Sequence, residues 1–272
     1  MPRPPRAAAA RSGRVRLGSL NGAAMIEVKG LRKSFTARGT VIRAVDDVSF
    51  EAHDGEITGL LGPNGAGKTT TLRMLYTLMS PDAGRVLVDG LDPGERPDDV
   101  RRRLGVLPDA RGVYKRLTAR ENIEYFGRLH GIPELVMAGR VERLVAALGM
   151  HEFIDRRTEG FSQGQRTKTA IARALVHDPR NVLLDEPTNS LDVMTTRSLR
   201  QFLRALKDEG RCVLFSSHIM QEVAALCDRI VVIAQGKVMA AGTPDEVRAQ
   251  TGEENLEDAF VKAIGSEEGL HA

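Results

Sequence analysis

Residues Gly62 to Thr69 read GPNGAGKT and match the pattern GxxxxGK[ST] at every specified position. The glycines of such a loop let backbone N–H groups point inward at phosphate oxygens, and a following helix adds its dipole. Lys68 would neutralise the β- and γ-phosphates of a nucleotide, and the Thr69 hydroxyl would ligate Mg²⁺. The residues predicted to bind the nucleotide here are Gly62, Pro63, Asn64, Gly65, Ala66, Gly67, Lys68, Thr69 and Thr70.

Two adjacent carboxylates end a short apolar run, Asn181-Val-Leu-Leu-Asp185-Glu186. Neighbouring side chains of a strand point to opposite sides, so Asp185 and Glu186 should have different roles. Asp185 suits the Mg²⁺ side of a triphosphate site, and Glu186 suits a general base that polarises the attacking water. Acids of an ordinary surface turn are the alternative, which the apolar run before them disfavours. The chemistry predicted is therefore hydrolysis of the triphosphate.

A Ser-Gln-Gly-Gln turn, Ser162 to Gln165, stands just ahead of a predicted helix. A serine hydroxyl and exposed amides at a helix N-terminus can bind an anion. Ser162 and Gly164, with Gln165 beside them, are therefore candidates for binding an anion.

The elements that must position these residues alternate as in a mostly parallel sheet covered by helices. A strand at Glu56–Leu61 leads into the glycine-rich loop, and an apolar periodicity predicts a helix at Thr69–Leu78 after it. From about residue 117 to 160 the pattern turns helical, beginning with the capping box Thr118 to Glu121, which predicts a helical lobe inserted into a domain spanning 25–264. We expect an α/β P-loop NTPase fold with an antiparallel β subdomain near the N-terminus. The other predicted elements lie at Ile26–Val28, Val45–Phe50, Arg85–Val88, Leu104–Leu107, Val136–Leu148, Thr195–Lys207, Cys212–Ser216, Met220–Leu226, Ile230–Ala234 and Leu256–Ile264, with a further helix after Thr243.

Composition limits the function classes. The 272-residue chain has a formal net charge of +3, but residues 1–24 contain five arginines and no acid, so the rest of the chain stands at −2. Nucleic-acid binding by the folded part is therefore not expected. Residues 1–24 are predicted to be a disordered basic tail. A transit peptide or contact with anionic lipid is possible for it, but an over-extended start before Met25 is favoured. Residues 265–272 are predicted to be a C-terminal tail.

No apolar run approaches the length of roughly 18 to 20 residues that would span a bilayer. The chain is therefore not expected to be a channel or carrier by itself.

In order and spacing, these motifs resemble the nucleotide-binding subunits of ABC transporters, over about Ile26 to Ile264. The resemblance implies that Phe35 stacks on adenine, although a plain core role is the alternative, and that Asp109 occupies the glutamine-loop position beside Mg²⁺. It identifies Ser162 to Gln165 as the signature, Ser190 to Asp192 as the loop that meets a partner subunit, and His218 as the switch histidine that contacts the γ-phosphate.

The resemblance also implies ATP and Mg²⁺ as cofactors and a head-to-tail homodimer that sandwiches ATP between the two subunits. A cassette of this family without membrane spans needs a transport path in another protein. This implies an integral membrane permease as partner and a place at the cytoplasmic face of the membrane. Two residues depart from the family pattern, because Gln163 replaces a glycine and Asp109 replaces a glutamine. The segment LPDARGVYKRLTARENIEYFGRLHG is similar to NatA-like exporters, which suggests sodium ions as the cargo.

A soluble ABC-type ATPase of translation or DNA repair is the alternative class. Such translation factors usually carry two cassettes, and chromosome-maintenance relatives insert long coiled coils between the two nucleotide motifs. Here Lys68 and Asp185 lie only 117 positions apart in a chain with one cassette, which favours the transporter subunit. A catalytically dead regulatory cassette is disfavoured because Lys68, Thr69, Asp185, Glu186 and His218 are all present.

Overall fold

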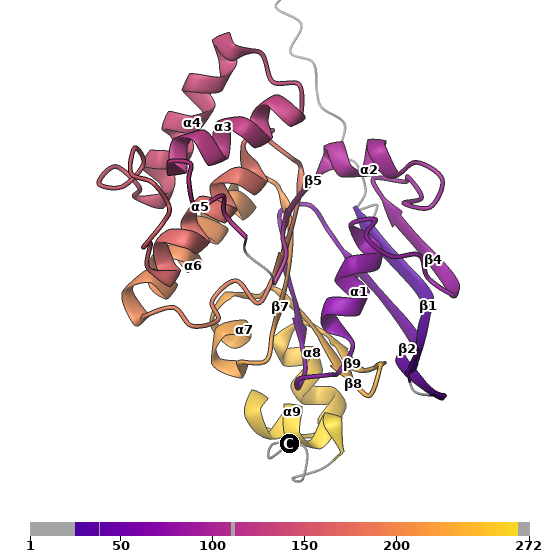
Figure 1. The fold of residues 1–272 in the computed structure, drawn as a ribbon. Helices are drawn as coiled ribbons and strands as arrows, with labels where there is room; N and C mark the ends of the chain where they lie inside the picture. Colours follow the sequence, from indigo (N-terminus) through magenta and orange to yellow (C-terminus); the bar gives the residue numbers. More distant parts are fainter. Residues whose placement is uncertain (1–24, 38, 110–111, 266–272) are drawn as a thin grey trace, which may run out of the picture.

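A computed structural model describes residues 25–265, except 38 and 110–111. The predicted basic tail, 1–24, and residues 266–272 of the predicted C-terminal tail lie outside these described residues. The described chain contains two β-sheets with helices around them (Figure 1). None of its described helices is both long and apolar enough to cross a membrane.

The larger sheet has six strands in the order β5-β6-β7-β3-β8-β9. Its strands are parallel except β9, which pairs antiparallel with β8. Every residue of β3, β6 and β7 is buried, as expected for strands covered on both faces. The bounds are β5 Leu104–Leu107, β6 Asn181–Asp185, β7 Cys212–Ser217, β3 Ile57–Leu61, β8 Arg229–Ala234 and β9 Lys237–Gly242.

The smaller sheet is antiparallel and has the order β2-β1-β4. It consists of β1 (Ile26–Ala37), β2 (Thr40–Ala52) and β4 (Ala83–Val88). Buried residues of this sheet pack in one hydrophobic cluster with α1 (Lys68–Leu75) and with one face of the larger sheet. The prediction of an antiparallel subdomain near the N-terminus, and of a P-loop NTPase fold, is therefore confirmed.

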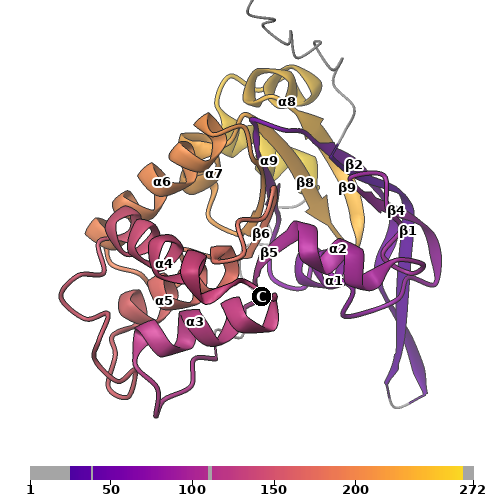
Figure 2. The same ribbon diagram turned by 90° about the horizontal axis from the view of Figure 1, so that it is seen from above.

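Helices cover both faces of the six-stranded sheet. Figures 1 and 2 show α3, α4, α5 and α6 on one side, and α1 and α2 with the antiparallel sheet on the other. The bounds are α2 Pro97–Arg103, α3 Ala119–Leu129, α4 Glu134–Leu148, α5 Gln163–Leu175, α6 Val193–Asp208, α7 Met220–Leu226, α8 Pro244–Thr251 and α9 Leu256–Ile264. Helices α3 and α4 fall in segment 117–160, and their buried hydrophobic residues belong to the same hydrophobic cluster as Ile171 and Leu175 of α5.

Local sequence signals explain most helix boundaries. The predicted capping box at Thr118 is present, with its side chain accepting from the Glu121 N–H. Helix α4 ends at Gly149, whose φ of 60° places it in the left-handed region where glycine is favoured. The helix predicted at Thr69–Leu78 begins one residue earlier and ends at Leu75.

Two elements were not predicted from the sequence. Helix α2 has only seven residues and buries only Val100, so it carries no apolar periodicity. Strand β9 follows β8 through a tight turn at Gln235 and Gly236, both with positive φ, which suits a two-residue hairpin. The sequence pattern that would predict β9 is weak, because β9 is an edge strand with few buried residues.

Candidate functional site

The predicted phosphate-binding and catalytic residues lie at the ends of three neighbouring strands of the larger sheet. The glycine-rich loop follows β3, Asp185 and Glu186 lie at the end of β6, and His218 follows β7. Strand β7 lies between β3 and β6, and all three are parallel, so their carboxyl ends meet at one edge. Open α/β sheets bind their ligands at this edge.

An open cleft at this edge collects most of the predicted residues. The phosphate loop from Asn64 to Thr70 lines it on one side. Asp109, Glu186, Asn189 and His218 line the rest. Gly62 and Pro63 do not line the cleft, although their carbonyl oxygens accept hydrogen bonds from the lysine that does.

The phosphate loop needs glycine at specific positions. Gly65 and Gly67 have φ values of 78° and 105°, which side chains rarely adopt. A Cβ on Gly67 would also overlap with the Ala44 carbonyl oxygen of β2, and a Cβ on Gly62 would overlap with the Ile233 carbonyl oxygen. The loop backbone is therefore packed tightly against β2 and β8, and glycine is required at Gly62 and Gly67.

Lys68 begins α1 and is buried, with 6% of its side chain exposed. Its ammonium donates hydrogen bonds to the carbonyl oxygens of Gly62 (2.7 Å) and Pro63 (3.1 Å). It also lies 3.5 Å from Glu186 Oε1. Burial lowers the pKa of Lys68, and the nearby Glu186 charge opposes that shift. The site thus holds a buried cation close to the predicted general base.

Asp185 is held by two hydroxyl groups. Its Oδ1 accepts hydrogen bonds from Ser216 Oγ (2.6 Å) and Thr69 Oγ1 (3.1 Å). Its Oδ2 is buried and has no hydrogen-bond partner among the described residues. Burial raises the pKa of Asp185, and the charges of Asp109 and Glu186 act in the same direction against the hydrogen bonds of Ser216 and Thr69.

A divalent cation fits this arrangement. A buried carboxylate oxygen with no partner, next to a hydroxyl and beside a second acid in the cleft, is the oxygen donor set that Mg²⁺ uses together with waters and substrate phosphates. The described residues contain no cluster of three acids, histidines or cysteines, so the protein alone offers no complete metal cage. Metal binding here would therefore depend on the phosphates of a nucleotide.

Glu186 and His218 form the second polar pair of the site. His218 Nδ1 lies 2.9 Å from Glu186 Oε2. Glu186 has a φ of 48°, a left-handed conformation that costs about 1–3 kcal/mol for a residue with a side chain. Its backbone N–H donates to Ser216 Oγ at 3.0 Å, which helps to hold this conformation. Ser216 therefore supports both adjacent carboxylates.

Two of these contributors were not predicted from the sequence. Asn189 lines the cleft three residues after Glu186. Ser216 was predicted only as the last residue of the strand Cys212–Ser216, yet it forms hydrogen bonds with Asp185 and with the Glu186 backbone. A polar residue at the end of a buried strand next to β6 was the only signal for it.

The signature turn lies apart from the cleft. Ser162 is the N-cap of α5 and forms a reciprocal capping box with Gln165, with distances of 3.2 Å and 3.0 Å. A Cβ on Gly164 would lie 3.2 Å from Thr195 Oγ1, so Gly164 packs against the start of α6. Neither Ser162 nor Gly164 lines the nucleotide cleft of the same chain.

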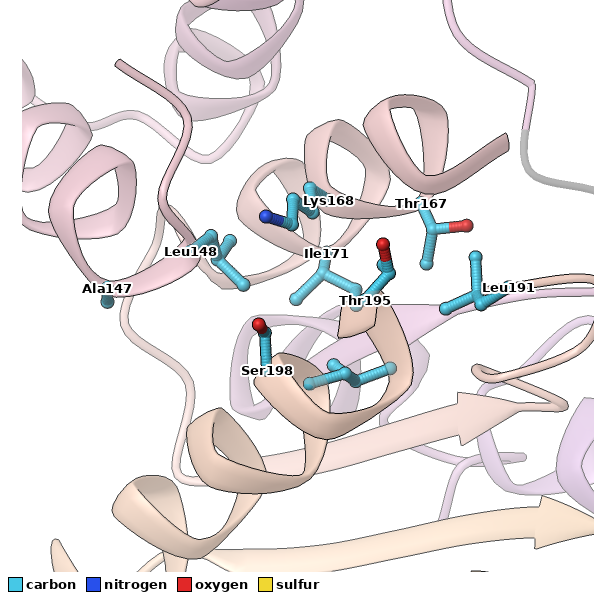
Figure 3. Close-up of a pocket in the computed structure, with 9 residues that line it drawn as sticks. Ala147, Leu148, Thr167, Lys168, Ile171, Leu191, Thr195 and Ser198 are labelled. Carbon is cyan, nitrogen blue, oxygen red and sulfur yellow. The ribbon is translucent and has the colours of Figure 1, made fainter. Parts of the chain in front are cut away.

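Asp192 caps α6 beside the signature turn. It accepts hydrogen bonds from the Thr195 N–H (2.8 Å) and Thr195 Oγ1 (2.6 Å), and these bonds lower its pKa. Figure 3 shows side chains of α5 and α6, such as Ile171 and Thr195, together with Leu191, around a small pocket between the helices. The signature turn and the loop ending at Asp192 therefore belong to one packed unit.

Phe35 lies away from the lining of the cleft. It is 39% exposed and pairs with Ile42 near the end of the β1–β2 hairpin, where Val41 and Ile42 are also exposed. The alternative of a plain core residue is therefore wrong. Stacking of this exposed aromatic ring on adenine stays a prediction.

Comparisons with known proteins agree with this geometry. The profile of the ABC transporter family matches residues 45–189. The ABC transporter ATP-binding protein NatA of Bacillus subtilis (strain 168) is 43% identical over 241 residues, which cover 88% of this chain and 98% of that protein.

Solved structures are also similar. An ATP-binding subunit of an ABC transporter matches with a TM-score of 0.80 at 29% identity, covering 88% of this chain and 99% of the other. A dimeric ATP-binding cassette in a post-hydrolysis state, bound to ADP and Pi, matches with a TM-score of 0.72 at 26% identity, covering 80% and 98%. The chain therefore belongs to the ABC transporter family, as an ATP-binding subunit that hydrolyses ATP.

Proposed function

We propose that the cleft binds ATP and Mg²⁺ and that water cleaves the bond between the β- and γ-phosphates there, with Glu186 as general base. The convergence of the phosphate loop, Asp185, Glu186 and His218 at one sheet edge carries this proposal. The loop amides and Lys68 bind the phosphates, and Phe35 stacks on the adenine. Thr69 and Asp185, with Asp109 nearby, would hold Mg²⁺, which neutralises phosphate charge when bound.

Glu186 and His218 would act on the water and the γ-phosphate. Glu186 accepts a proton from the attacking water, and the His218 ring next to it orients the carboxylate and contacts the phosphate. The Lys68 ammonium uses two of its three N–H donors on the carbonyl oxygens of Gly62 and Pro63, which leaves the third for a phosphate oxygen.

The signature residues complete the site from a second copy of the chain. Ser162 and Gly164 do not reach the cleft of their own chain, yet they present a hydroxyl and helix N-terminal amides suited to an anion. A head-to-tail homodimer would place them on the ATP bound by the partner, with Gln165 and Asp192 beside the interface. The dimeric state of the similar cassette supports this arrangement.

Hydrolysis would drive export through a separate integral membrane permease at the cytoplasmic face of the membrane. Segment 117–160 would act as a helical lobe that transmits movement of the Asp109 loop to that permease, within a single ATP-binding domain at 25–264. Sodium ions are the cargo we propose, because of the similarity of residues 107–131 to NatA-like exporters. Sodium flux by the subunit reconstituted with its permease tests this cargo, and flux of a drug instead of sodium would contradict it.

The catalytic proposal is tested by phosphate release from purified protein with MgATP and with EDTA. We expect Mg²⁺-dependent turnover that falls by about 10²–10⁴-fold in Glu186→Gln and in His218→Ala. Glu257→Gln, an exposed acid at the start of α9, is the matched control and should keep the wild-type rate. Wild-type rates in Glu186→Gln would contradict the assignment of the general base.

A further inference from the structure

Glu222 is a buried acid that the roles described above do not use. It lies in the first turn of α7 and is only 6% exposed. A buried carboxylate is costly unless hydrogen bonds compensate for the water it loses. Here its Oε2 accepts two of them, from Thr188 Oγ1 and from Ser217 Oγ (3.3 Å).

These two hydroxyl groups lie next to Glu186 and His218, one in the loop after β6 and the other at the end of β7. Thr188 lies two residues after Glu186, and Ser217 directly precedes His218. The Thr188 and Ser217 side chains are buried, at 6% and 0% exposure. Water therefore does not easily take the place of a hydrogen-bond partner that a substitution removes. One carboxylate oxygen therefore joins the loop after β6 to the last residue of β7, directly before His218.

Ser217 extends the connection to the other side of the histidine. Its Oγ accepts a hydrogen bond from the Ile219 N–H at 3.0 Å while it donates to Glu222. The backbone on both sides of His218 is thus fixed relative to Glu222, and through Thr188 relative to the turn after Glu186.

The Glu186–His218 contact needs such support. It is a single 2.9 Å contact, His218 is partly exposed, and the Glu186 backbone is in a left-handed conformation that its surroundings must maintain. A displacement of about 1 Å in a catalytic group can cost on the order of 10²-fold in rate. Glu222 itself does not line the nucleotide cleft, so it can act only through these loops.

We propose that Glu222 is a positioning residue, whose carboxylate clamps the Thr188 and Ser217 hydroxyls and thereby sets the distance between Glu186 and His218. The proposal rests on the roles assigned above to Glu186 and His218. The function required of Glu222 is that of a hydrogen-bond acceptor at a fixed place.

The test uses variants that distinguish the need for a hydrogen-bond acceptor at Glu222 from the need for a side chain of similar volume. Glu222→Gln keeps an oxygen at the same reach, whereas Glu222→Leu fills a similar volume without one. Thr188→Val removes the hydroxyl at nearly constant volume. Thr251→Val is the matched control, because the Thr251 hydroxyl donates to the Val247 carbonyl in α8, far along the chain from the site.

Turnover, the KM for ATP, nucleotide affinity and the thermal midpoint are measured for each full-length variant with MgATP. We expect Glu222→Leu and Thr188→Val to lose about ten- to hundredfold in kcat, with nucleotide affinity within about twofold of wild type. Glu222→Gln should retain a rate within about threefold of wild type, and Thr251→Val should be unchanged. In a Glu186→Gln background, Thr188→Val should reduce the residual rate no further, because the clamp acts through Glu186.

Several results would overturn the clamp. These are a wild-type kcat in Thr188→Val, a loss in Glu222→Gln equal to that in Glu222→Leu, or a loss in Thr188→Val that persists unchanged in the Glu186→Gln background. The first of these decides the question even if Glu222→Leu does not fold. Failure of the proposed function is distinguishable, because it would appear as a wild-type rate in Glu186→Gln alone.

Discussion

Replacing Asp185 with asparagine should stabilise the nucleotide-free protein while abolishing its response to MgATP. The Asp185 carboxylate is 1% exposed, and its Oδ2 is buried without a hydrogen-bond partner among the described residues. Burial raises its pKa, so the folded state holds the charged form less favourably than the unfolded chain does. Asp185→Asn removes the charge and keeps the size and an acceptor for Ser216 and Thr69.

Two opposing effects set the size of the change in stability that Asp185→Asn causes. Burial disfavours the charged form of Asp185, and the charges of Asp109 and Glu186 add to the cost of ionisation. Against this, the hydrogen bonds from Ser216 and Thr69 weaken when they no longer meet a charged oxygen. The raised pKa of Asp185 shows that the cost of ionisation exceeds the contribution of these bonds. A net gain of about 1 kcal/mol would raise the thermal midpoint by about 2–4 °C.

The pH dependence follows from the direction of the shift. A carboxyl whose pKa is raised on folding favours the folded state fully below its unfolded pKa, and this contribution is lost as the pH rises through the folded pKa. The advantage of Asp185→Asn should therefore be largest at neutral pH and should narrow as the pH is lowered.

Thermal unfolding of both proteins at pH 7 and pH 5, with and without MgATP, measures these effects. We expect MgATP to raise the midpoint of the wild type and not that of Asp185→Asn. A nucleotide-free Asp185→Asn protein that is less stable than wild type at pH 7 would show instead that the hydrogen bonds of the charged form outweigh its burial.

Further predictions concern the two glycine-rich motifs. Gly67→Ala should lower the free energy of unfolding by about 1–3 kcal/mol in urea titration, because its Cβ overlaps with the Ala44 carbonyl oxygen at a φ of 105°. Gly65→Ala, with a φ of 78° and open space around the Cβ, should cost about 1–2 kcal/mol, and an equal or larger loss than in Gly67→Ala would argue against the packing term. Ser162→Ala should cost about 1 kcal/mol by loss of the α5 cap shared with Gln165, and an unchanged stability would show that the capping box contributes nothing.

Much of the site could be predicted because its residues lie in short sequence motifs directly next to buried strands. The phosphate loop, Asp185 and Glu186 each adjoin a buried strand, and parallel strands bring their carboxyl ends together without further information. His218 follows for the same reason, since it comes directly after β7.

The remainder depends on contacts between distant parts of the chain. Glu222 looks from the sequence like an ordinary first-turn acid of an amphipathic helix, and only the packing of α7 beside Thr188 gives it two buried donors. Asn189 enters the cleft through the path of the loop after β6, and β9 forms through pairing with β8. Tertiary pairing of this kind leaves no periodic pattern in the sequence.

In the proposed head-to-tail dimer, ATP closes two copies of the chain so that Ser162 of each contacts the nucleotide of the other. The measurement is light scattering of Glu186→Gln, in which bound ATP is consumed only slowly, with MgATP and without nucleotide. We predict the 29.7 kDa monomer without nucleotide and a dimer of about 59 kDa with MgATP. Adding Ser162→Arg to the same protein should leave it monomeric with MgATP although each chain still binds the nucleotide. A Glu186→Gln protein that binds ATP and stays at the monomer mass, or a dimer that Ser162→Arg does not affect, would contradict the account.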